Sequence, residues 1–293
     1  MIEGGGLGSF AATDIGPTDV NSKNGVIDIV AADENEATVL AQQVLSYFQG
    51  PKGDWSAADQ SMLQSAMPDD RRYTYDIRKL IELLVDTGSF IELQQQYGKT
   101  IVVGFMRIEG HPFGLIANDN RILGGAVDAT SAAKAATFLN LCSSFSLPVV
   151  SLCDTPGFMV GPDSEAEGAA RKMAEFFTAG ANLRSPLVCI FLRKAYGLGA
   201  MAMAGSSFVK PVYSAAWPMG EFGAMGLEGA VKLGFKKELE EQQGEAREVL
   251  FNELVSKMYE AGKATEAAAY LEIDAVIDPI ETRAVIINSI GLH

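Results

Sequence analysis

The sequence predicts an α/β fold in which parallel strands are covered by helices on both faces. Two mainly apolar runs, LPVVSLCDTPG (residues 147–157) and SPLVCIFLRK (residues 185–194), alternate with segments of helical periodicity. Strands buried on both faces have such continuous apolar runs, because helices on either side exclude water from every side chain. Hydrophobic residues make up 48% of the 293 residues, which is enough for a sizeable core.

The first hundred residues predict two helices separated by a connector. A short strand at 26–31 precedes a helix for which Asp33 is the N-cap, with Glu36 three residues later. Residues 50–74 are polar and rich in turn formers, so they predict a connector. Residues 76–85 then predict the second helix.

From Thr100 the pattern becomes strongly α/β. The strand-like runs TIVVGFMRIEG and HPFGLIAND follow each other directly, which predicts a hairpin. Helices then alternate with apolar strands, and the chain from Gly223 is mostly helical before a last short strand and helix. The expected elements are helices 131–145, 164–183 and one opened by GLGAMAMAG, and strands 147–157, 185–194, 206–218 and 274–279.

The charge balance argues against nucleic acid as a partner. The formal net charge is −14, from 37 acidic and 23 basic residues, and no basic run is present. Binding to a phosphate backbone needs clustered Lys and Arg. No apolar run reaches the roughly 18 residues of a membrane helix, and the first residues do not resemble a signal peptide. We therefore expect a cytoplasmic protein that does not enter a membrane.

The cysteines and histidines argue against a metal site. Cys142, Cys153 and Cys189 lie in apolar runs, which is typical of reduced core thiols in a cytoplasmic protein. The only histidines are His111 and His293. His111 lies between two strand-like runs, so we expect a turn residue there and not a catalytic one.

Two strand-to-helix turns carry the residues on which chemistry can depend. The first is 154–161 (DTPGFMVG) and the second is 193–200 (RKAYGLGA). In parallel α/β folds, ligands gather at the carboxyl ends of the strands. The free amide groups at the start of the next helix there attract negative charge.

The glycines of the second turn favour an oxyanion site. Gly197 and Gly199 let the backbone turn sharply and bring amides within reach of a carbonyl oxygen. Such amides stabilise an enolate or another oxyanion, each by about 3 kcal/mol. By itself, this spacing favours a tight packing turn between a helix and a sheet. A dinucleotide fingerprint does not fit, because Ala202 stands where GxGxxG requires glycine.

The motifs in order are more specific than any one of them. FGLIAND, ILGGAVDATSAAKAATFLNLCSSFSLPVVSLCDTPGF, RKAYGLGAMAMAG and AAWPMGEFGAMGLEGAV follow one another. This order resembles the C-terminal half of the carboxyltransferase (β) subunits of biotin-dependent acyl-CoA carboxylases, in the crotonase-like (ClpP/crotonase) superfamily. The resemblance runs from about Gly25 to Asp278 and implies a crotonase-like ββα spiral. It implies that residues 1–24, which open on MIEGGG, are the tail end of an N-terminal half, and that 25–293 are the C-terminal carboxyltransferase domain.

The resemblance also implies a reaction and its partners. In this family CO2 passes from carboxybiotin, on a carrier protein, to the α-carbon of an acyl-CoA. The N-terminal half holds mainly the acyl-CoA, and the C-terminal half of a neighbouring subunit holds mainly the carboxybiotin. Two oxyanion holes are needed, and the released biotin anion serves as the base. Expected partners are an N-terminal carboxyltransferase half and a biotin carboxylase or biotin carrier subunit, in a homo- or hetero-oligomer.

The resemblance assigns roles to single residues. The turn at Gly197 supplies the hole on the biotin side, with amides from Leu198 and Gly199 or from Gly199 and Ala200. Many relatives have a shorter turn there, so the choice of amides stays open. The other residues expected to contact biotin are Tyr196, Gly197, Thr155, Pro156, Gly157 and Phe158.

For several of these residues, a structural role in packing explains the sequence as well as a role in binding does. The Thr155–Phe158 segment is also explained as a rigid turn in which Asp154 caps the next segment. Met201 and Met203 fit either an apolar acyl site or the core, and Trp217 is expected in the core. A second set of residues expected to shape the pocket, on the turn after the FGLIAND strand, is Asn118, Gly124 and Gly125.

Two other functions fit the sequence less well. A self-sufficient hydratase or thioesterase needs carboxylates at the substrate carbon, and neither turn offers a pair. A non-catalytic scaffold is disfavoured by the intact turn at 197–200. Because the family's complete subunit is about twice this length, we expect the isolated chain to bind biotin poorly and not to carboxylate acyl-CoA.

Overall fold

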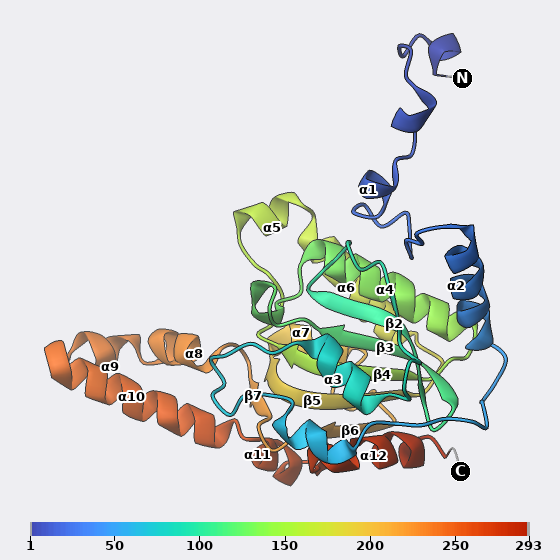
Figure 1. Cartoon of the computed structure of the whole chain (residues 1–293). Coiled ribbons are helices and arrows are strands. Elements are labelled where there is room, and N and C mark those ends of the chain that lie inside the picture. The colour runs from blue at the N-terminus through green and yellow to red at the C-terminus, as the bar shows by residue number, and fades with distance from the viewer. Residues whose placement is uncertain (1, 292–293) are drawn as a thin grey trace.

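The computed structural model of the chain describes residues 2–291, and its centre is one mixed sheet between two layers of helices (Figure 1). The order of strands is β1-β2-β3-β4-β5-β6-β8, with β7 beside β5. β1 to β3 are antiparallel neighbours, and the pairs from β3 onward are parallel. The strands are β1 Ile91–Leu93, β2 Ile101–Ile108, β3 His111–Asn118, β4 Val149–Thr155, β5 Leu187–Tyr196, β6 Tyr213–Ala216, β7 Glu221–Gly223 and β8 Ala275–Val276.

The helices cover both faces of the sheet, as the apolar strands predict. One core lies between the sheet and α2, α4, α6 and α7, and the other between the sheet and α3 and α12. In β5, Cys189 and Phe191 point into the first core, and Val188 and Ile190 into the second. The helices are α1 Thr18–Asn21, α2 Glu34–Ser46, α3 Ile77–Leu84, α4 Ala129–Ser144, α5 Pro162–Ala166, α6 Ala169–Ala181, α7 Gly197–Met203, α8 Leu227–Gly234, α9 Lys236–Glu240, α10 Gly244–Ala261, α11 Ala264–Ala269 and α12 Thr282–Ser289.

Capping side chains explain where α2 and α3 begin. Asp33 accepts the amide hydrogen of Glu36 at 2.8 Å, and the carboxylate of Glu36 accepts the amide of Ala32 in return. Asp76 likewise caps α3. Since a side-chain oxygen satisfies amides that the helix leaves unpaired, both starts were readable from the sequence.

Three expected boundaries are wrong. Residues 26–31 form no strand, because they pack against the loop after β1, where the amide of Gln94 donates to the carbonyl of Asp28 at 2.6 Å. The expected helix 164–183 is two helices, α5 and α6, which separate at Gly168, where φ is +71°. His111 is the first residue of β3, and the hairpin turn consists of Glu109 and Gly110.

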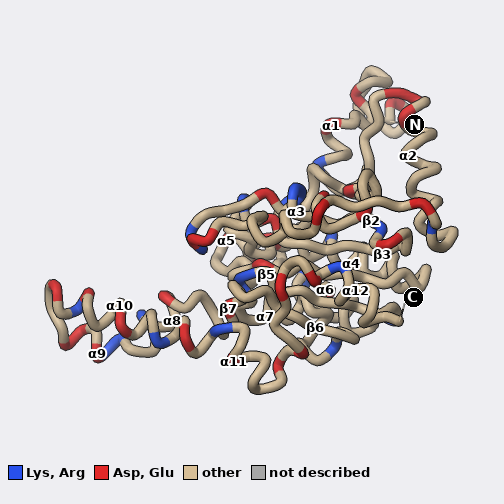
Figure 2. The backbone as a smooth tube through the Cα atoms, turned by 60° about the horizontal axis from the view of Figure 1, so that its bottom comes forward, with Lys and Arg blue, Asp and Glu red and all other residues tan. Residues whose placement is uncertain are grey.

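Two arms leave the body (Figure 1). Residues 2–21 extend away from the sheet, and α8, α9 and α10 form a helical hairpin on which charges of both signs are spread (Figure 2). No residue of α10 is buried.

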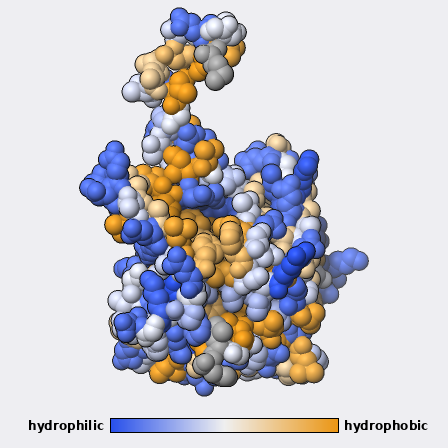
Figure 3. Space-filling view, turned by 90° about the vertical axis from the view of Figure 1, so that its right-hand side faces the viewer, coloured by the Kyte–Doolittle hydropathy of each residue, from blue (hydrophilic) through white to orange (hydrophobic). Residues whose placement is uncertain are grey.

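An apolar groove lies between α2 and the end of α4, and Figure 3 shows apolar side chains gathered on that side of the molecule.

None of the helices within residues 2–291 combines the length and the apolar character that a bilayer crossing requires. A short 3-10 turn, η4 (Leu123–Gly125), follows β3 and reaches the carboxyl edge of the parallel strands.

Candidate functional site

The turns that follow β4 and β5 lie backbone against backbone at the carboxyl edge of the sheet. Thr155 pairs with Ala195, so the two strands leave the sheet at the same level. A Cβ atom on Gly199 would lie 2.7 Å from the Cα atom and the carbonyl carbon of Gly157. Glycine at position 199 therefore allows an approach of the two turns that a side chain would prevent.

The first turn of α7 offers unpaired backbone amides. The helix begins at Gly197, whose φ of +56° favours glycine, and Tyr196 is its N-cap. The carbonyl of an N-cap residue accepts the first intrahelical hydrogen bond, which here comes from the amide of Ala200. The amides of Gly197, Leu198 and Gly199, the first three residues of the helix, have no acceptor within it.

The turn after β4 is held by its own hydrogen bonds. The hydroxyl of Thr155 accepts the amide hydrogen of Gly157 at 3.1 Å, and the carbonyl of Gly157 accepts that of Val127 at 3.0 Å. Pro156 and Phe158 are half-buried. The structure thus brings this predicted turn to the same edge as α7, with the Thr155 side chain engaged inside the loop.

Asp154 lies beneath both turns and is completely buried. Its carboxylate forms an ion pair with Arg193 at 3.1 Å and accepts the backbone amide hydrogen of Lys194, also at 3.1 Å. The hydroxyl of Tyr75 and the side-chain amide of Asn120 donate to it as well. The expectation that Asp154 caps the next segment is wrong, because its donors come from the neighbouring strand, from the turn after β3 and from the connector.

A third turn, η4, packs against the same edge. The ammonium group of Lys194 donates to the carbonyl of Gly124 at 2.7 Å, and burial lowers the pKa of Lys194. A Cβ atom on Gly125 would overlap the carbonyl oxygen of Asp154. The side chain of Asn118 accepts the Asp154 amide hydrogen at 3.1 Å. The three residues Asn118, Gly124 and Gly125 therefore reach the edge at which the sequence placed them.

A polar cluster that the sequence did not predict adjoins the N-cap of α7. The hydroxyl of Tyr196 donates to the carboxylate of Glu221 at 2.7 Å, and burial raises the pKa of Glu221. The Arg71 guanidinium, from the connector, lies 3.8 Å from Glu221 and 3.7 Å from Glu228. It also stacks on Tyr259 of α10, 3.2 Å from the ring centre. These side chains come from separate segments, and only Glu221 and Glu228 stand in a motif that the sequence singled out, AAWPMGEFGAMGLEGAV.

The residues behind the first turn of α7 belong to the core. Ala202 and Met203 are completely buried, and Met201 is half-buried. Trp217 is buried as predicted, and its indole N–H donates to the hydroxyl of Thr282 at 3.0 Å. The three cysteines are buried free thiols. The described residues contain no group of three or more His, Cys, Asp or Glu side chains that could hold a metal ion.

With this geometry in place, comparison with known proteins decides the family. Residues 9–293 match the model of the carboxyl transferase domain. The chain belongs to the carboxyl transferase domain family. The 12S subunit of methylmalonyl-CoA carboxyltransferase from Propionibacterium freudenreichii subsp. shermanii is 32% identical over 282 residues, which are 92% of this chain and 53% of that protein. The propionyl-CoA carboxylase beta chain of Saccharopolyspora erythraea is 32% identical over 284 residues, 90% of this chain and 52% of that one.

Solved structures of carboxyl transferase domains have the same fold. A single-chain, multi-domain long-chain acyl-CoA carboxylase is 51% identical, with a TM-score of 0.92 over 98% of this chain and 28% of that one. A hexameric transcarboxylase 12S with methylmalonyl-CoA and methylmalonic acid bound is 30% identical, with a TM-score of 0.88 over 99% of this chain and 57% of that one. The expected crotonase fold, with mostly parallel strands covered by helices, is thereby confirmed. The chain spans about half the length of the curated relatives it matches.

Proposed function

We propose that this chain is the C-terminal half of a biotin-dependent acyl-CoA carboxyltransferase and supplies the biotin side of its active site. The reaction transfers CO2 from carboxybiotin, on a carrier protein, to the α-carbon of an acyl-CoA. The observation that carries the proposal is the backbone contact of Gly199 with Gly157, which joins the two turns singled out in the sequence. Membership of the carboxyl transferase domain family supports the reaction class.

The amides of Leu198 and Gly199 are the donors that we assign to the oxyanion. The amide of Ala200 is used inside α7, so the other pair of amides considered from the sequence is disfavoured. Two fixed amide donors suit an oxygen on which negative charge develops, and each stabilises it by about 3 kcal/mol. Carboxybiotin supplies the carboxyl group when it is bound.

In this proposal the biotin ring lies beside these amides. Glycine at 199 lets the backbone of Gly157 approach the first turn of α7, where a side chain would block it. Tyr196 and Gly197 set the start of α7, and the segment Thr155–Phe158 forms the opposite wall. We assign these residues to biotin binding, with Tyr196 held in place by its hydrogen bond to Glu221.

In this proposal, other parts of the assembly bind the acyl-CoA and deliver the biotin. The acyl-CoA binds mainly to an N-terminal half, and residues 1–24 are the end of that half. Figure 1 supports the division, because residues 2–21 extend away from the sheet. A biotin carboxylase or biotin carrier subunit delivers the cofactor.

The two variants Leu198→Pro and Leu198→Ala test the proposal. Proline removes the amide hydrogen at a first-turn position that tolerates it, whereas alanine keeps that hydrogen. The Leu198 side chain is 62% exposed, so neither change disturbs the core. In the assembly that co-purifies with the tagged chain, we expect Leu198→Pro to lower kcat for acyl-CoA carboxylation about 100-fold and Leu198→Ala to leave it near wild type. Equal kcat values, or an assembly without a biotinylated protein, would contradict it.

A further inference from the structure

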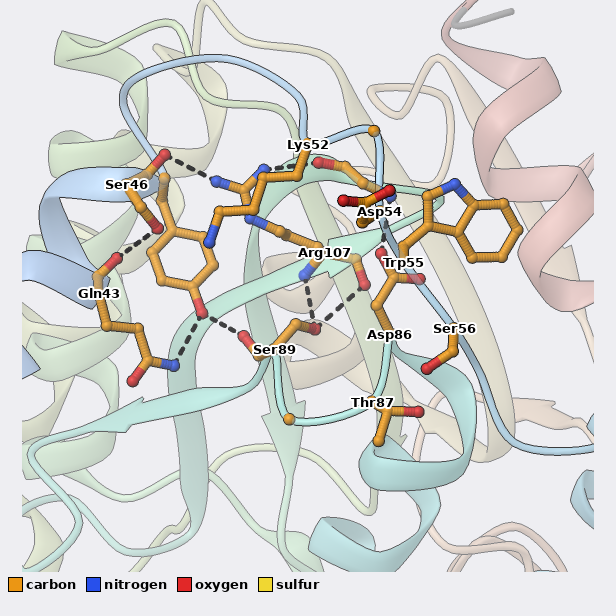
Figure 4. Close-up of a pocket in the computed structure, with 14 residues that line it drawn as sticks. Gln43, Ser46, Lys52, Asp54, Trp55, Ser56, Asp86, Thr87, Ser89 and Arg107 are labelled. Carbon is orange, nitrogen blue, oxygen red and sulfur yellow. Dashed lines mark hydrogen bonds between the residues drawn. The ribbon is translucent and has the colours of Figure 1, made fainter.

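A second site lies at the opposite edge of the sheet. A pocket of about 660 Å³ opens beside the β2–β3 hairpin turn, beyond the amino ends of the parallel strands (Figure 4). Its walls are the end of α2, the segment 52–56, the turn 86–89 and Arg107 of β2. The carboxyl edge with α7 is at the other end of these strands, so this pocket is separate from the proposed active site.

Two cations line the pocket without a carboxylate partner. Arg107 is 4% exposed, and its guanidinium donates to the carbonyls of Ser46, Gly50 and Gly110. Lys52 lines the same pocket, and its backbone amide donates to the same Gly110 carbonyl at 3.0 Å. Neither cation has an Asp or Glu oxygen within ion-pair distance among residues 2–291. Lys52 is exposed, whereas Arg107 is buried, and the burial of a charge is costly unless hydrogen bonds or an anion compensate it.

The carboxylates of the pocket do not neutralise these cations. Asp86 is buried and forms an ion pair with Arg283 at 2.7 Å. It also accepts the amide hydrogens of Glu109 and Gly110. Asp54 is exposed. The lining has two cations and two acids, and Arg283, which pairs with Asp86 from outside the lining, adds one positive charge beside it.

Arg107 and Lys52 bring hydrogen-bond donors to this pocket. A guanidinium has five N–H groups, and Arg107 uses three of them on carbonyls within the described residues. Lys52 adds an ammonium group, and the hydroxyls of Ser56 and Thr87 also line the space. A ligand that fits must be rich in acceptors and negatively charged, which describes a phosphate group.

The pocket is preformed and has an aromatic wall. The amide of Thr87 donates to the carbonyl of Ser56 at 2.7 Å, and that of Asp86 to the carbonyl of Arg107 at 2.9 Å. These bonds tie the walls to one another without a ligand. Trp55, which is 48% exposed, forms one side, and the volume suits a small molecule.

We propose that this pocket binds the phosphate group of a small metabolite, with Arg107 and Lys52 as its anion contacts and Trp55 beside the organic part. Figure 4 shows the three side chains around the space. The proposal does not depend on the proposed carboxyl transfer, which takes place at the other edge of the sheet.

Tryptophan fluorescence tests the site. Trp55 and the buried Trp217 are the only tryptophans, so we expect inorganic phosphate and AMP to change the emission of Trp55 saturably at constant ionic strength. Lys52→Gln should weaken binding about tenfold, the loss of one charge-assisted contact. Lys99→Gln, at an exposed lysine outside the pocket, should not. Tighter binding of AMP than of phosphate would place the base at Trp55, and equal affinities would identify free phosphate as the ligand.

Equilibrium dialysis with labelled phosphate supports the optical readout. Trp55→Phe should lose the signal and keep binding, and Arg107→Lys should bind more weakly but remain folded. Failure of both probes to bind saturably at millimolar concentrations would overturn the proposal. So would equal affinities of Lys52→Gln and Lys99→Gln.

Discussion

At the scale of single residues, Gly199 decides how closely the two turns approach. Gly199→Ala would place a Cβ atom 2.7 Å from the backbone of Gly157, so one turn must move. We expect a loss of about 1–3 kcal/mol in the free energy of unfolding, as for other overpacked sites, together with loss of carboxylation by the assembly. Chemical denaturation of the purified variant measures the first effect.

Gly229→Ala is the matched control for this change. Gly229 lies in α8, and a Cβ atom there would meet nothing within 4 Å. Alanine in a helix interior is favoured over glycine by about 0.5–1 kcal/mol, so this variant should be slightly more stable. Equal stability of the two alanine variants would show that the contact at Gly199 imposes no constraint.

Glu221 should make stability depend on pH. Burial raises its pKa in the folded state, so the folded protein holds the proton more tightly than the unfolded chain does. Stability is therefore lost as the pH rises through the raised pKa. Glu221→Gln should remove this loss, so that the variant gains stability relative to wild type between about pH 5 and about pH 8. Urea denaturation at both values measures the difference, and a constant difference would count against the effect.

The sequence predicted the part of the site that is local. The spacing of Gly197 and Gly199 marks the start of α7, because a sharp turn requires glycine at positions that are close together in the sequence. The role of Asp154 was missed because its partner Arg193 belongs to the next strand, 39 positions away. A contact between parallel neighbours leaves no periodic trace in a single sequence.

At the scale of elements, Lys134 of α4 holds the loop before β2. The ammonium group is buried and donates to the carbonyls of Gln94, Tyr97, Gly98 and Ile101. Lys134→Met would remove the ammonium donor from these carbonyls, of which those of Gln94 and Gly98 keep a backbone amide donor, so we expect a loss of about 2–3 kcal/mol. Lys172→Met, which removes only a surface ion pair with Glu175, should cost less than about 1 kcal/mol.

The same lysine predicts a pH effect of the opposite sign to that of Glu221. Burial lowers the pKa of Lys134 to about 8, whereas the unfolded value is about 10.4. The unfolded chain binds more protons between these values, so stability should rise with pH there in the wild type but not in Lys134→Met. Denaturation of both proteins at about pH 8 and about pH 10 measures it, and parallel slopes would contradict the assignment.

Elements were predictable where their own residues define them. α2 and α3 begin at caps, and β4 and β5 are mainly apolar until their last few residues. The segment 26–31 has a strand-like composition, but it meets the chain only just beyond the end of the edge strand β1, through one backbone hydrogen bond from Gln94, so it forms no strand. Pairing partners are a property of the whole fold and cannot be read from six residues.

At the scale of the whole molecule, the groove between α2 and α4 exposes more apolar surface than a free subunit needs. Phe145, which is 58% exposed, lies 4.6 Å from Phe48 between ring centres, and Leu45 is 60% exposed beside them. Contiguous apolar surface of this kind marks an interface. In the assembly that we propose, another part of the carboxyltransferase covers this groove, so the isolated chain should bind a hydrophobic dye and the assembly should bind less of it.

Phe145→Ser tests whether this groove is the surface concerned. The variant should reduce dye binding by the isolated chain and also weaken its recovery in the assembly, because serine removes apolar area from the interface. Tyr270→Ser is the matched control, since Tyr270 is 78% exposed at the end of α11 and does not line the groove. If both variants assembled equally well, the groove would not be an interface, and its apolar side chains would require another explanation.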